Sequence, residues 1–466
     1  MADTRIEKDS LGNKEVPQQA YWGIQSQRAI ENFPISGLKA HPKFIDSFVM
    51  VKKAAALANK EVGLLKPEIA DAIAKAADEI LAGKLRDQFV VDVFQMGAGT
   101  SFNMNVNEVL ANRAIEHLGG KKGDYTLCNP NDHPNMAQST NDAFPTSMRV
   151  CIRLLLEELI PVLKDLEHAL AAKGKEFDSI LKSGRTHLQD AVPIRLGQEF
   201  TAYSIAIRKC TERIRAVSQL IEELGIGGSA VGTGLNTHPK YRVILVDYLK
   251  NWTKIPFRCA EDMREAMQSN FPVAATAATL KLLATELSRI CNDFRLMCSG
   301  PLTGFAEIVL PAVQPGSSIM PGKVNPSMAE MLNMVCFQVI GNELTVSMAA
   351  QAGQLELNVM MPVMAFNMNF SIEILKNAVR EFTNRCVKGI VANADQCKHY
   401  AEISPSLATA LNPYIGYARA AEVVKKALKE KKSIPQVVRE DKLLTEDQIR
   451  TVLDPKPLTE PGLPGK

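Results

Sequence analysis

The 466-residue chain lacks the patterns that direct a protein to a membrane or to nucleic acid. No apolar stretch reaches the roughly 20 residues that a membrane-spanning helix needs. The formal net charge is only +3, and the basic run from Lys425 to Lys432 is interrupted by apolar and acidic residues. Such a weak charge does not indicate a nucleic-acid partner. Because the first ten residues are polar and resemble no targeting segment, the chain is expected to stay in the cytoplasm.

Cysteine and histidine do not occur in the arrangements that bind structural metals. The nine cysteines are scattered from Cys128 to Cys397, without a Cys-x-x-Cys pair or a cysteine–histidine cluster at zinc spacing. The sequence therefore predicts reduced thiols and no metal site. Repeats and low-complexity segments are missing, and strand patterns are sparse. With 46% hydrophobic and 23% charged residues, the composition is that of an ordinary globular protein, for which we expect an all-α fold.

Long helical patterns occupy the middle of the chain. From Phe200 to Leu224 apolar residues alternate at spacings of four and three, and segments 152–170 and 280–297 show the same rhythm. Segments 327–352 and 355–392 are also compatible with helices, so we expect five long helices. Helices of about 30 residues would be about 45 Å long, and several are apolar on more than one face. They are therefore predicted to pack against one another and against other subunits.

Shorter patterns on either side of this bundle predict three domains. Residues 1–140 would form a mainly helical N-terminal domain, residues 141–395 the bundle, and residues 396–466 a small helical C-terminal domain. In the last of these, we expect a helix near residues 418–431. Thr445 is expected to cap a final helix.

One loop rich in glycine and proline carries the most informative group of side chains. Residues 316–326 contain two adjacent hydroxyls, Ser317 and Ser318, together with the cation Lys323 and the amide Asn325. Glycine widens the accessible backbone conformations and proline interrupts helices, so this segment is expected to be a mobile loop. A serine can act as a base when a lysine stabilises its alkoxide. The same residues could also form an ordinary polar turn.

Two other segments place hydroxyl groups at predicted helix starts. One is a Gly-Ala-Gly-Thr sequence that ends at Thr100, ahead of a helical run. The other places Ser139, Thr140 and Asn141 at the start of the first long helix, with Pro145 expected in its first turn. Free N–H groups at helix starts attract anions, so two such starts suit a dicarboxylate, although each could be a simple cap.

Two further motifs are ambiguous from their residues alone. Thr186 and His187 precede another bundle helix, but an isolated histidine is more often structural than catalytic. The glycines between residues 225 and 234 invite a dinucleotide-binding interpretation. That interpretation fails because no strand precedes them and no β-α-β pattern surrounds them. They are expected to form an irregular connection between helices.

Taken together, these segments resemble the signatures of the aspartase/fumarase superfamily over essentially the whole chain. Its members eliminate ammonia, water or an amine from succinate-type substrates and leave fumarate. Within the superfamily, residues 99–105 and 129–133 are most similar to the aspartate-deaminating branch. Met96, Leu302, Met361 and Pro134 depart from the usual pattern. The resemblance implies a homotetramer whose active sites are shared between subunits, and a reaction that requires no cofactor.

The resemblance also implies a mechanism, the reversible deamination of L-aspartate to fumarate and ammonia through an aci-carboxylate intermediate. Ser317 would be the base that removes the β proton when the loop closes and excludes water. His187 and Asn141 would hold the amino group, and Glu330 would orient His187. The other site residues would bind the two carboxylates: Thr100, Ser139, Thr140 and Ser318 the β-carboxylate, and Thr186, Lys323 and Asn325 the α-carboxylate.

Other functions remain open from the sequence. A class II fumarase would act on malate, and a third candidate is a lyase for a substituted aspartate. A non-catalytic helical scaffold is a different class of answer. The presence of Ser317, Lys323, Asn325 and His187 argues against a scaffold.

Overall fold

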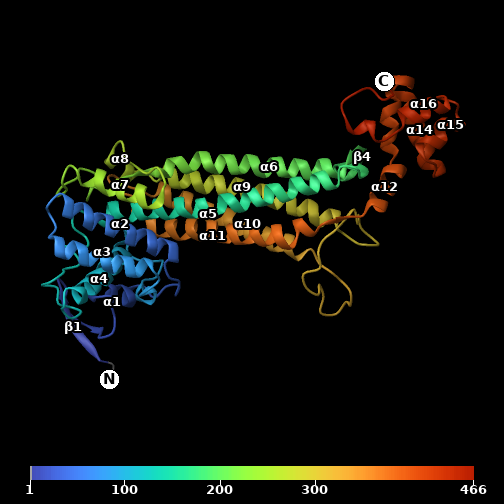
Figure 1. The fold of residues 1–466 in the computed structure, drawn as a ribbon. Helices are drawn as coiled ribbons and strands as arrows, with labels where there is room; N and C mark the ends of the chain where they lie inside the picture. Colours follow the sequence, from blue (N-terminus) through green and yellow to red (C-terminus); the bar gives the residue numbers. More distant parts are fainter. Residues whose placement is uncertain (1–2, 466) are drawn as a thin grey trace. The chain divides into compact units, whose positions relative to one another are not determined.

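A computed structural model describes residues 3–465 (Figure 1). These residues form two compact units. Unit 1 consists of the residues up to Pro161 together with Cys210–Thr285 and Val335–Lys376. Unit 2 consists of Val162–Lys209, Glu286–Met334 and the residues from Asn377 onward. The five predicted long helices are present, and each has residues in both units: α5 (Thr140–Glu176), α6 (Leu196–Ser218), α9 (Phe271–Met297), α10 (Ser327–Gln351) and α11 (Met361–Arg385).

The described residues confirm the all-α class, with sixteen α-helices and four small sheets of two strands each. The sequence patterns did not predict these sheets, because no strand is longer than seven residues and four strands have only two residues. They are the antiparallel pairs β1 (Thr4–Asp9) with β2 (Gly12–Pro17), β3 (Leu181–Thr186) with β4 (Gln189–Arg195) and β7 (Ile308–Val309) with β8 (Val391–Ala392), and the parallel pair β5 (Glu223–Leu224) with β6 (Arg258–Cys259).

Three details of the long helices differ from prediction. Helix α6 ends at Ser218, although Ile221 and Leu224 continue the apolar rhythm, because both are buried in a 3-10 turn and in β5 instead. Helix α11 is shorter than the predicted segment 355–392, because the chain before it bends back at Asn358, whose amide donates to the carbonyls of residues 349 and 350. Pro145 lies in the second turn of α5 rather than in its first.

Unit 1 is built around an aromatic core next to the starts of two helices. The rings of Phe44 and Phe48, from α2 (Pro42–Glu61), pack against Phe102 of α4 (Thr100–His117) and Phe144 of α5 at centroid distances of 5.2–5.9 Å. Helix α2 also packs against α3 and α7. The helices of this unit beyond the long ones are α1 (Ile24–Asn32), α2 (Pro42–Glu61), α3 (Pro67–Leu81), α4 (Thr100–His117), α7 (Tyr241–Thr253) and α8 (Met263–Gln268).

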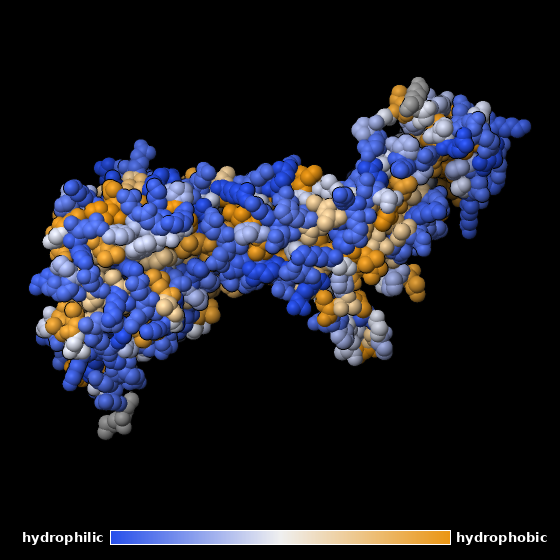
Figure 2. Space-filling model, in the orientation of Figure 1, coloured by the Kyte–Doolittle hydropathy of each residue, from blue (hydrophilic) through white to orange (hydrophobic). Residues whose placement is uncertain are grey.

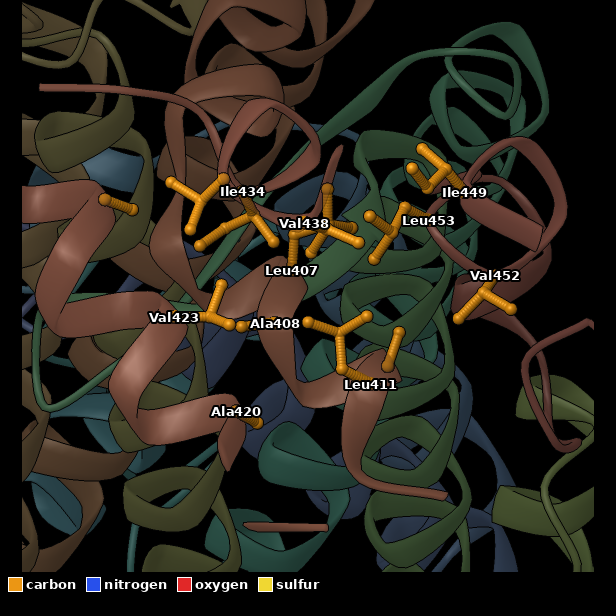
Figure 3. Packing of buried hydrophobic residues seen from close by; sticks show 13 residues of the cluster. Leu407, Ala408, Leu411, Ala420, Val423, Ile434, Val438, Ile449, Val452 and Leu453 are labelled. Atoms are coloured by element: carbon orange, nitrogen blue, oxygen red, sulfur yellow. The ribbon is translucent and has the colours of Figure 1, made fainter. Parts of the chain in front are cut away.

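In unit 2 the long helices pack through another aromatic cluster. Phe294 of α9 lies 5.4 Å from Phe200 of α6 and 5.8 Å from Phe382 of α11, measured between ring centroids. The C-terminal part has a separate core around Leu411, Val438 and neighbouring apolar side chains (Figure 3). Its helices are α12 (Ala394–Ile403), α13 (Asn412–Ile415), α14 (Tyr417–Glu430), α15 (Ile434–Glu440) and α16 (Glu446–Val452).

The predicted cap of the last helix is confirmed. The Thr445 hydroxyl accepts from the backbone N–H of Gln448 at 3.2 Å, and the Gln448 side chain accepts from the backbone N–H of Thr445 at 2.9 Å. This capping box satisfies two of the backbone N–H groups at the start of α16.

Apolar side chains also lie on the surface, interspersed with hydrophilic ones (Figure 2). Helix α10 buries Leu332 and Val339, yet Met334, Phe337 and Leu344 are 60–63% exposed. A helix that is apolar on two faces has more apolar surface than its own chain covers. No helix among residues 3–465 is both long enough and apolar enough to cross a membrane.

Candidate active site

The start of α4 presents the first predicted substrate-binding hydroxyl. Gly99, directly before Thr100, has a φ of +86°, and a Cβ atom there would lie 2.2 Å from the Phe144 ring. Both the backbone conformation and the close packing therefore require glycine. Thr100 is half-buried and lines a cavity of about 400 Å³, together with Met96. The departure from the family pattern at Met96 therefore lies beside a predicted binding residue.

The start of α5 is held by a buried carboxylate. Asp142 accepts hydrogen bonds from the backbone N–H groups of Ser139 at 2.9 Å, Gly227 at 3.0 Å and Ser229 at 2.9 Å. Burial raises the pKa of Asp142 to about 6, although these N–H groups act in the opposite direction. The glycine-rich segment is irregular, as predicted, and it is fastened to the start of α5. It connects a strand to a helix rather than two helices, because β5 directly precedes the glycines and pairs in parallel with β6 beyond α7. The sequence did not reveal these strands, since each has only two residues.

The three predicted residues at this helix start have defined contacts. The backbone N–H of Asn141 donates to the Ser139 hydroxyl at 3.2 Å, and its side-chain amide donates to the carbonyl of Ala230 at 2.8 Å. The Thr140 hydroxyl accepts from the amide of Asn103 at 3.0 Å. These hydroxyls are therefore held in place before any ligand binds.

In unit 2, Thr186 and His187 lie at the tip of the β3–β4 hairpin. His187 and Leu188 form its two-residue turn, with φ angles of +54° and +59°, and both side chains are exposed. Tight hairpins favour such positive φ angles, but usually with glycine or asparagine, so the sequence contained no clear hairpin signal. The turn places His187 at a point that solvent and ligands can reach.

The base of this hairpin is held by buried charges. Arg185 donates to Glu307 at 2.6 Å, and Glu307, which is fully buried, also lies 2.7 Å from the ammonium of Lys182. The Arg185 guanidinium stacks 4.2 Å from the ring of Phe305. Since Glu307 directly precedes β7, these contacts fasten the hairpin to the segment that leads into the serine-containing loop.

The serine-containing loop has no helix or strand between β7 and α10, as expected. The Ser317 hydroxyl accepts from the backbone N–H groups of Ile319 at 3.2 Å and Met320 at 2.9 Å. The backbone N–H of Gly316 donates to the carbonyl of Lys323 at 2.9 Å, which closes the neck of the loop. Ser318 and Lys323 are exposed, while Ser317 and Asn325 are partly buried.

Asn325 and Glu330 lie where this loop joins α10. The Asn325 amide donates to the carbonyl of Gly316 and so also holds the neck of the loop. Glu330 lies in the first turn of α10 and is half-buried. Across residues 3–465, no three histidine, cysteine, aspartate or glutamate side chains are grouped so as to hold a metal ion.

The predicted site residues are divided between the two units. Four belong to unit 1, and the remaining seven belong to unit 2, so neither unit alone contains the complete set. The group in unit 1 is Thr100, Ser139, Thr140 and Asn141, and the group in unit 2 is Thr186, His187, Ser317, Ser318, Lys323, Asn325 and Glu330.

Residues behind the unit 1 hydroxyls were missed by sequence reasoning. Lys52, Asn103, Asn107 and Asp142 are all at most 2% exposed. Asn103 lies within a recognised motif, which could have drawn attention to it. Nothing in the local sequence distinguishes Lys52 from a solvent-exposed lysine, because lysines on amphipathic helices normally point outward.

Comparison with known proteins places this helical fold and its serine-containing loop in a class of enzymes. The family described as Lyase matches residues 12–341, and the family described as Fumarase C C-terminus matches residues 407–460. The chain therefore belongs to the lyase family, the aspartase/fumarase superfamily that its motifs resemble.

Within that family, the full-length matches include aspartate ammonia-lyases. The chain is 50% identical to the aspartate ammonia-lyase of a Bacillus species over 464 residues, which cover 100% of this chain and 99% of the relative. It is 47% identical to the aspartate ammonia-lyase of Escherichia coli strain K12 over 465 residues, or 99% of this chain and 97% of the relative.

Solved structures of this family share the fold whatever reaction their names imply. A fumarate lyase:delta crystallin from Brucella melitensis bound to cobalt has a TM-score of 0.95 at 46% identity, covering 98% of this chain and 100% of that chain. A class II fumarase from Schistosoma mansoni has a TM-score of 0.96 at 37% identity, covering 98% and 99%. The fold therefore does not separate these enzymes, and the substrate must be argued from sequence and site.

Proposed function

We propose that this protein is an aspartate ammonia-lyase, which converts L-aspartate reversibly into fumarate and ammonia. The observation that carries this proposal is the 50% identity to an aspartate ammonia-lyase over 464 residues, against 37% to a class II fumarase of the same fold. Every site residue that the family resemblance implies is also present in the chain.

In this reaction the C–H bond at the β carbon of aspartate breaks first. A base takes the proton, and the electron pair moves into the neighbouring carboxylate to form the dianionic aci-carboxylate. The Cα–N bond then breaks, ammonia leaves, and the Cα–Cβ double bond of fumarate forms. Since the amino group of the substrate is already an ammonium, it leaves without a dedicated acid, whereas the hydroxyl of malate would need a proton from an acid to leave as water.

Ser317 is the proposed base, and its surroundings support this role. Two backbone N–H groups donate to its hydroxyl oxygen at 3.2 and 2.9 Å. Such donors stabilise the charged alkoxide and so favour the form that accepts a proton. Closure of the loop over the substrate would deliver this oxygen to the β proton.

The hydroxyls of unit 1 are proposed to bind the carboxylate that becomes negatively charged. Thr100 and Thr140 lie at helix starts, where N–H groups and the helix dipole attract anions. With Ser139 and Ser318, they would supply donors aimed at the aci-carboxylate, and preorganised donors act most strongly where charge develops. Thr186, Lys323 and Asn325 would hold the other carboxylate. Asn141 and His187 would hold the amino group, with His187 oriented by Glu330.

A complete site is proposed to form only in a homotetramer, by residues from different subunits. The division of the site residues between units and the exposed apolar face of α10 support this proposal. Within each subunit we also propose three domains, formed by residues 1–140, 141–395 and 396–466. Sedimentation should show a tetramer, and a monodisperse, active monomer would contradict the proposal.

A cytoplasmic location fits the nine free cysteines, since reducing compartments keep thiols free.

Two incubations test the proposed reaction against its alternative. With fumarate and ammonium we expect aspartate to form, and with fumarate in water alone we expect no malate. The near-equal TM-score to a class II fumarase makes hydration the second candidate. Malate from fumarate in water, without aspartate in the first incubation, would establish that candidate instead.

A further inference from the structure

A lysine is buried in unit 1 behind the hydroxyls proposed to bind the β-carboxylate. Lys52 of α2 has 0% exposure, and its ammonium donates to the Oδ1 atom of Asn135 at 3.0 Å. It lies 5.7 Å from the centroid of the Phe48 ring and forms no salt bridge among residues 3–465. Burial of an unpaired charge is strongly unfavourable. A charge in this position therefore needs an explanation beyond stability.

A chain of hydrogen bonds leads from this ammonium to Thr140. The Oδ1 atom of Asn135 accepts from Lys52 and also from the amides of Asn103 at 3.2 Å and Asn107 at 3.1 Å. The amide of Asn103 donates in turn to the Thr140 hydroxyl at 3.0 Å. Three hydrogen bonds, through the side chains of Asn135 and Asn103, thus connect a buried cation to a residue of the proposed site.

The charge determines the direction of every hydrogen bond in this chain. A lysine ammonium only donates, so the atom of Asn135 that faces it must be the carbonyl oxygen. Asn103 must then present its NH₂ group to that oxygen, and the same group reaches Thr140. Because the Thr140 oxygen accepts from Asn103, its hydroxyl proton stays available to donate to a ligand.

We propose that Lys52 is a positioning residue of the active site, which makes Thr140 a donor to the negatively charged intermediate and places a positive charge behind that donor. The inference rests on the proposed function, in which Thr140 binds the carboxylate that becomes the aci-carboxylate. Preorganised donors and charges of this kind stabilise a developing dianion more than the ground-state substrate.

A nearby negative charge favours the protonated, charged form of Lys52. Burial lowers the pKa of Lys52 to about 7, and the negative charge of Asp142 acts in the opposite direction. Asp142 also acts on the fully buried Tyr241 of α7, where it and burial raise the pKa of the hydroxyl, which stays neutral. A dianion at Thr140 would act on Lys52 in the same sense as Asp142.

The test compares two ligands, succinate and the nitronate of 3-nitropropionate. Succinate has the shape of the substrate in its ground state. The nitronate carries its negative charge on two oxygens of a planar group, as the aci-carboxylate does. We expect Lys52→Met and Lys52→Gln to lower the preference for nitronate over succinate by about 10- to 100-fold, since a charge acting through protein contributes on this scale.

The neighbouring Lys53 supplies a matched control. It lies on the same helix and pairs with Asp78 at 2.5 Å, away from the asparagine chain. Lys53→Met should keep the parent's preference for the nitronate within about twofold, because it removes an equal charge without touching Asn135. A similar loss in both variants would mean that total charge, rather than the asparagine chain, sets the preference, and would overturn the proposal.

Folding is checked by circular dichroism and sedimentation before ligands are compared. A Lys52 variant that folds like the parent and keeps the nitronate preference would overturn the proposal. If neither Lys52 variant folds, Asn103→Leu decides, because it removes the link to Thr140 and leaves the charge. The preference of Asn103→Leu for the nitronate over succinate must fall as well. An unchanged preference would contradict the proposed role of the hydrogen bonds between Lys52 and Thr140. A parent enzyme that makes no aspartate from fumarate and ammonium would instead refute the proposed function.

Discussion

The two groups of site residues differ in how firmly the fold holds them. In unit 1 the hydroxyls lie at the starts of two packed helices, behind which Lys52, Asn103 and Asp142 are at most 1% exposed. In unit 2, Ser318 and Lys323 are exposed, and the loop around them is tied mainly at its neck. The difference matches their proposed tasks. Donors that stabilise charge act best when they are fixed in advance, whereas a base on a loop can admit substrate and then close.

The largest effect is expected in the exposed loop, at the proposed base. Ser317→Ala should lower turnover by about 10⁴-fold or more, the upper end for a general base, because no other group is placed to take the β proton. Dicarboxylate affinity should stay close to that of the parent. Ser318→Ala should lower turnover by only about 10²- to 10³-fold, as expected for one oxyanion donor.

Exchange of the β proton with deuterium separates these two serines. Aspartate incubated in deuterated water should lose its β proton with the parent and, more slowly, with Ser318→Ala. The Ser317→Ala variant should not exchange it. Exchange at the parent rate in Ser317→Ala would show that another residue is the base.

In the buried group, the largest effect is expected at Gly99. Gly99→Ala should lower the free energy of unfolding by about 2–4 kcal/mol, since it combines a strained positive φ with overpacking against Phe144. Gly83 is the matched control, because it has a φ of +96° with open space around it. Gly83→Ala should lower the free energy by roughly 1–2 kcal/mol, the conformational part alone. Equal losses in urea denaturation would show that packing at Gly99 is unimportant.

A smaller effect is expected for the cation of the loop. Lys323→Ala should weaken succinate binding by about 1.5–3 kcal/mol, the range for a charge-assisted hydrogen bond. Titration calorimetry measures this change directly. Lys323 is proposed to bind a carboxylate rather than to transfer a proton. An unchanged affinity for succinate would therefore show that Lys323 does not bind the substrate. The preference for nitronate over succinate should change little, in contrast to the Lys52 variants.

The smallest effect concerns the pH dependence of unit 1. The Arg113 hydrogen bond lowers the pKa of Glu79 to about 2, and this pair links α3 to α4, which begins at Thr100. A carboxylate whose pKa is depressed by folding stabilises the native state above its unfolded pKa, near 4.5. That stability is lost as the pH falls from about 4.5 towards 2. Glu79→Gln should therefore be less stable than the parent at pH 7, and the difference should shrink on acidification.

Denaturation midpoints between pH 3 and pH 7 measure this effect, with Asp78→Asn as the control. Asp78 is adjacent and also pairs with a lysine, but its side chain is 59% exposed. Water screens such a pair, so its removal should change the midpoint little at any pH. A pH-independent loss in Glu79→Gln would contradict the ion-pair interpretation.

Much of the fold followed from local sequence. The apolar rhythm of α9 predicted a helix because residues three and four apart lie on one face whatever the rest of the chain does. The cap at Thr445 was also predictable, because a capping hydroxyl bonds to an N–H group only three residues further along the chain. The end of α6 could not be predicted, because Ile221 and Leu224 continue the rhythm and only their contacts in the folded chain end the helix. The β3–β4 hairpin escaped notice because its turn, His187 and Leu188, lacks the residues that such turns usually contain.

Lys52 and Lys53 show what the sequence predicts and what depends on the tertiary structure. By itself, the sequence placed both lysines in a mainly helical N-terminal domain, and its motifs indicated the family and the candidate catalytic groups. Nothing local distinguishes these two neighbours. The folded chain brings Asn135 to one, which is fully buried, and Asp78 to the other, which stays accessible to solvent. Burial and pairing depend on residues distant in sequence, so only the tertiary structure decided which charge lies behind the proposed site.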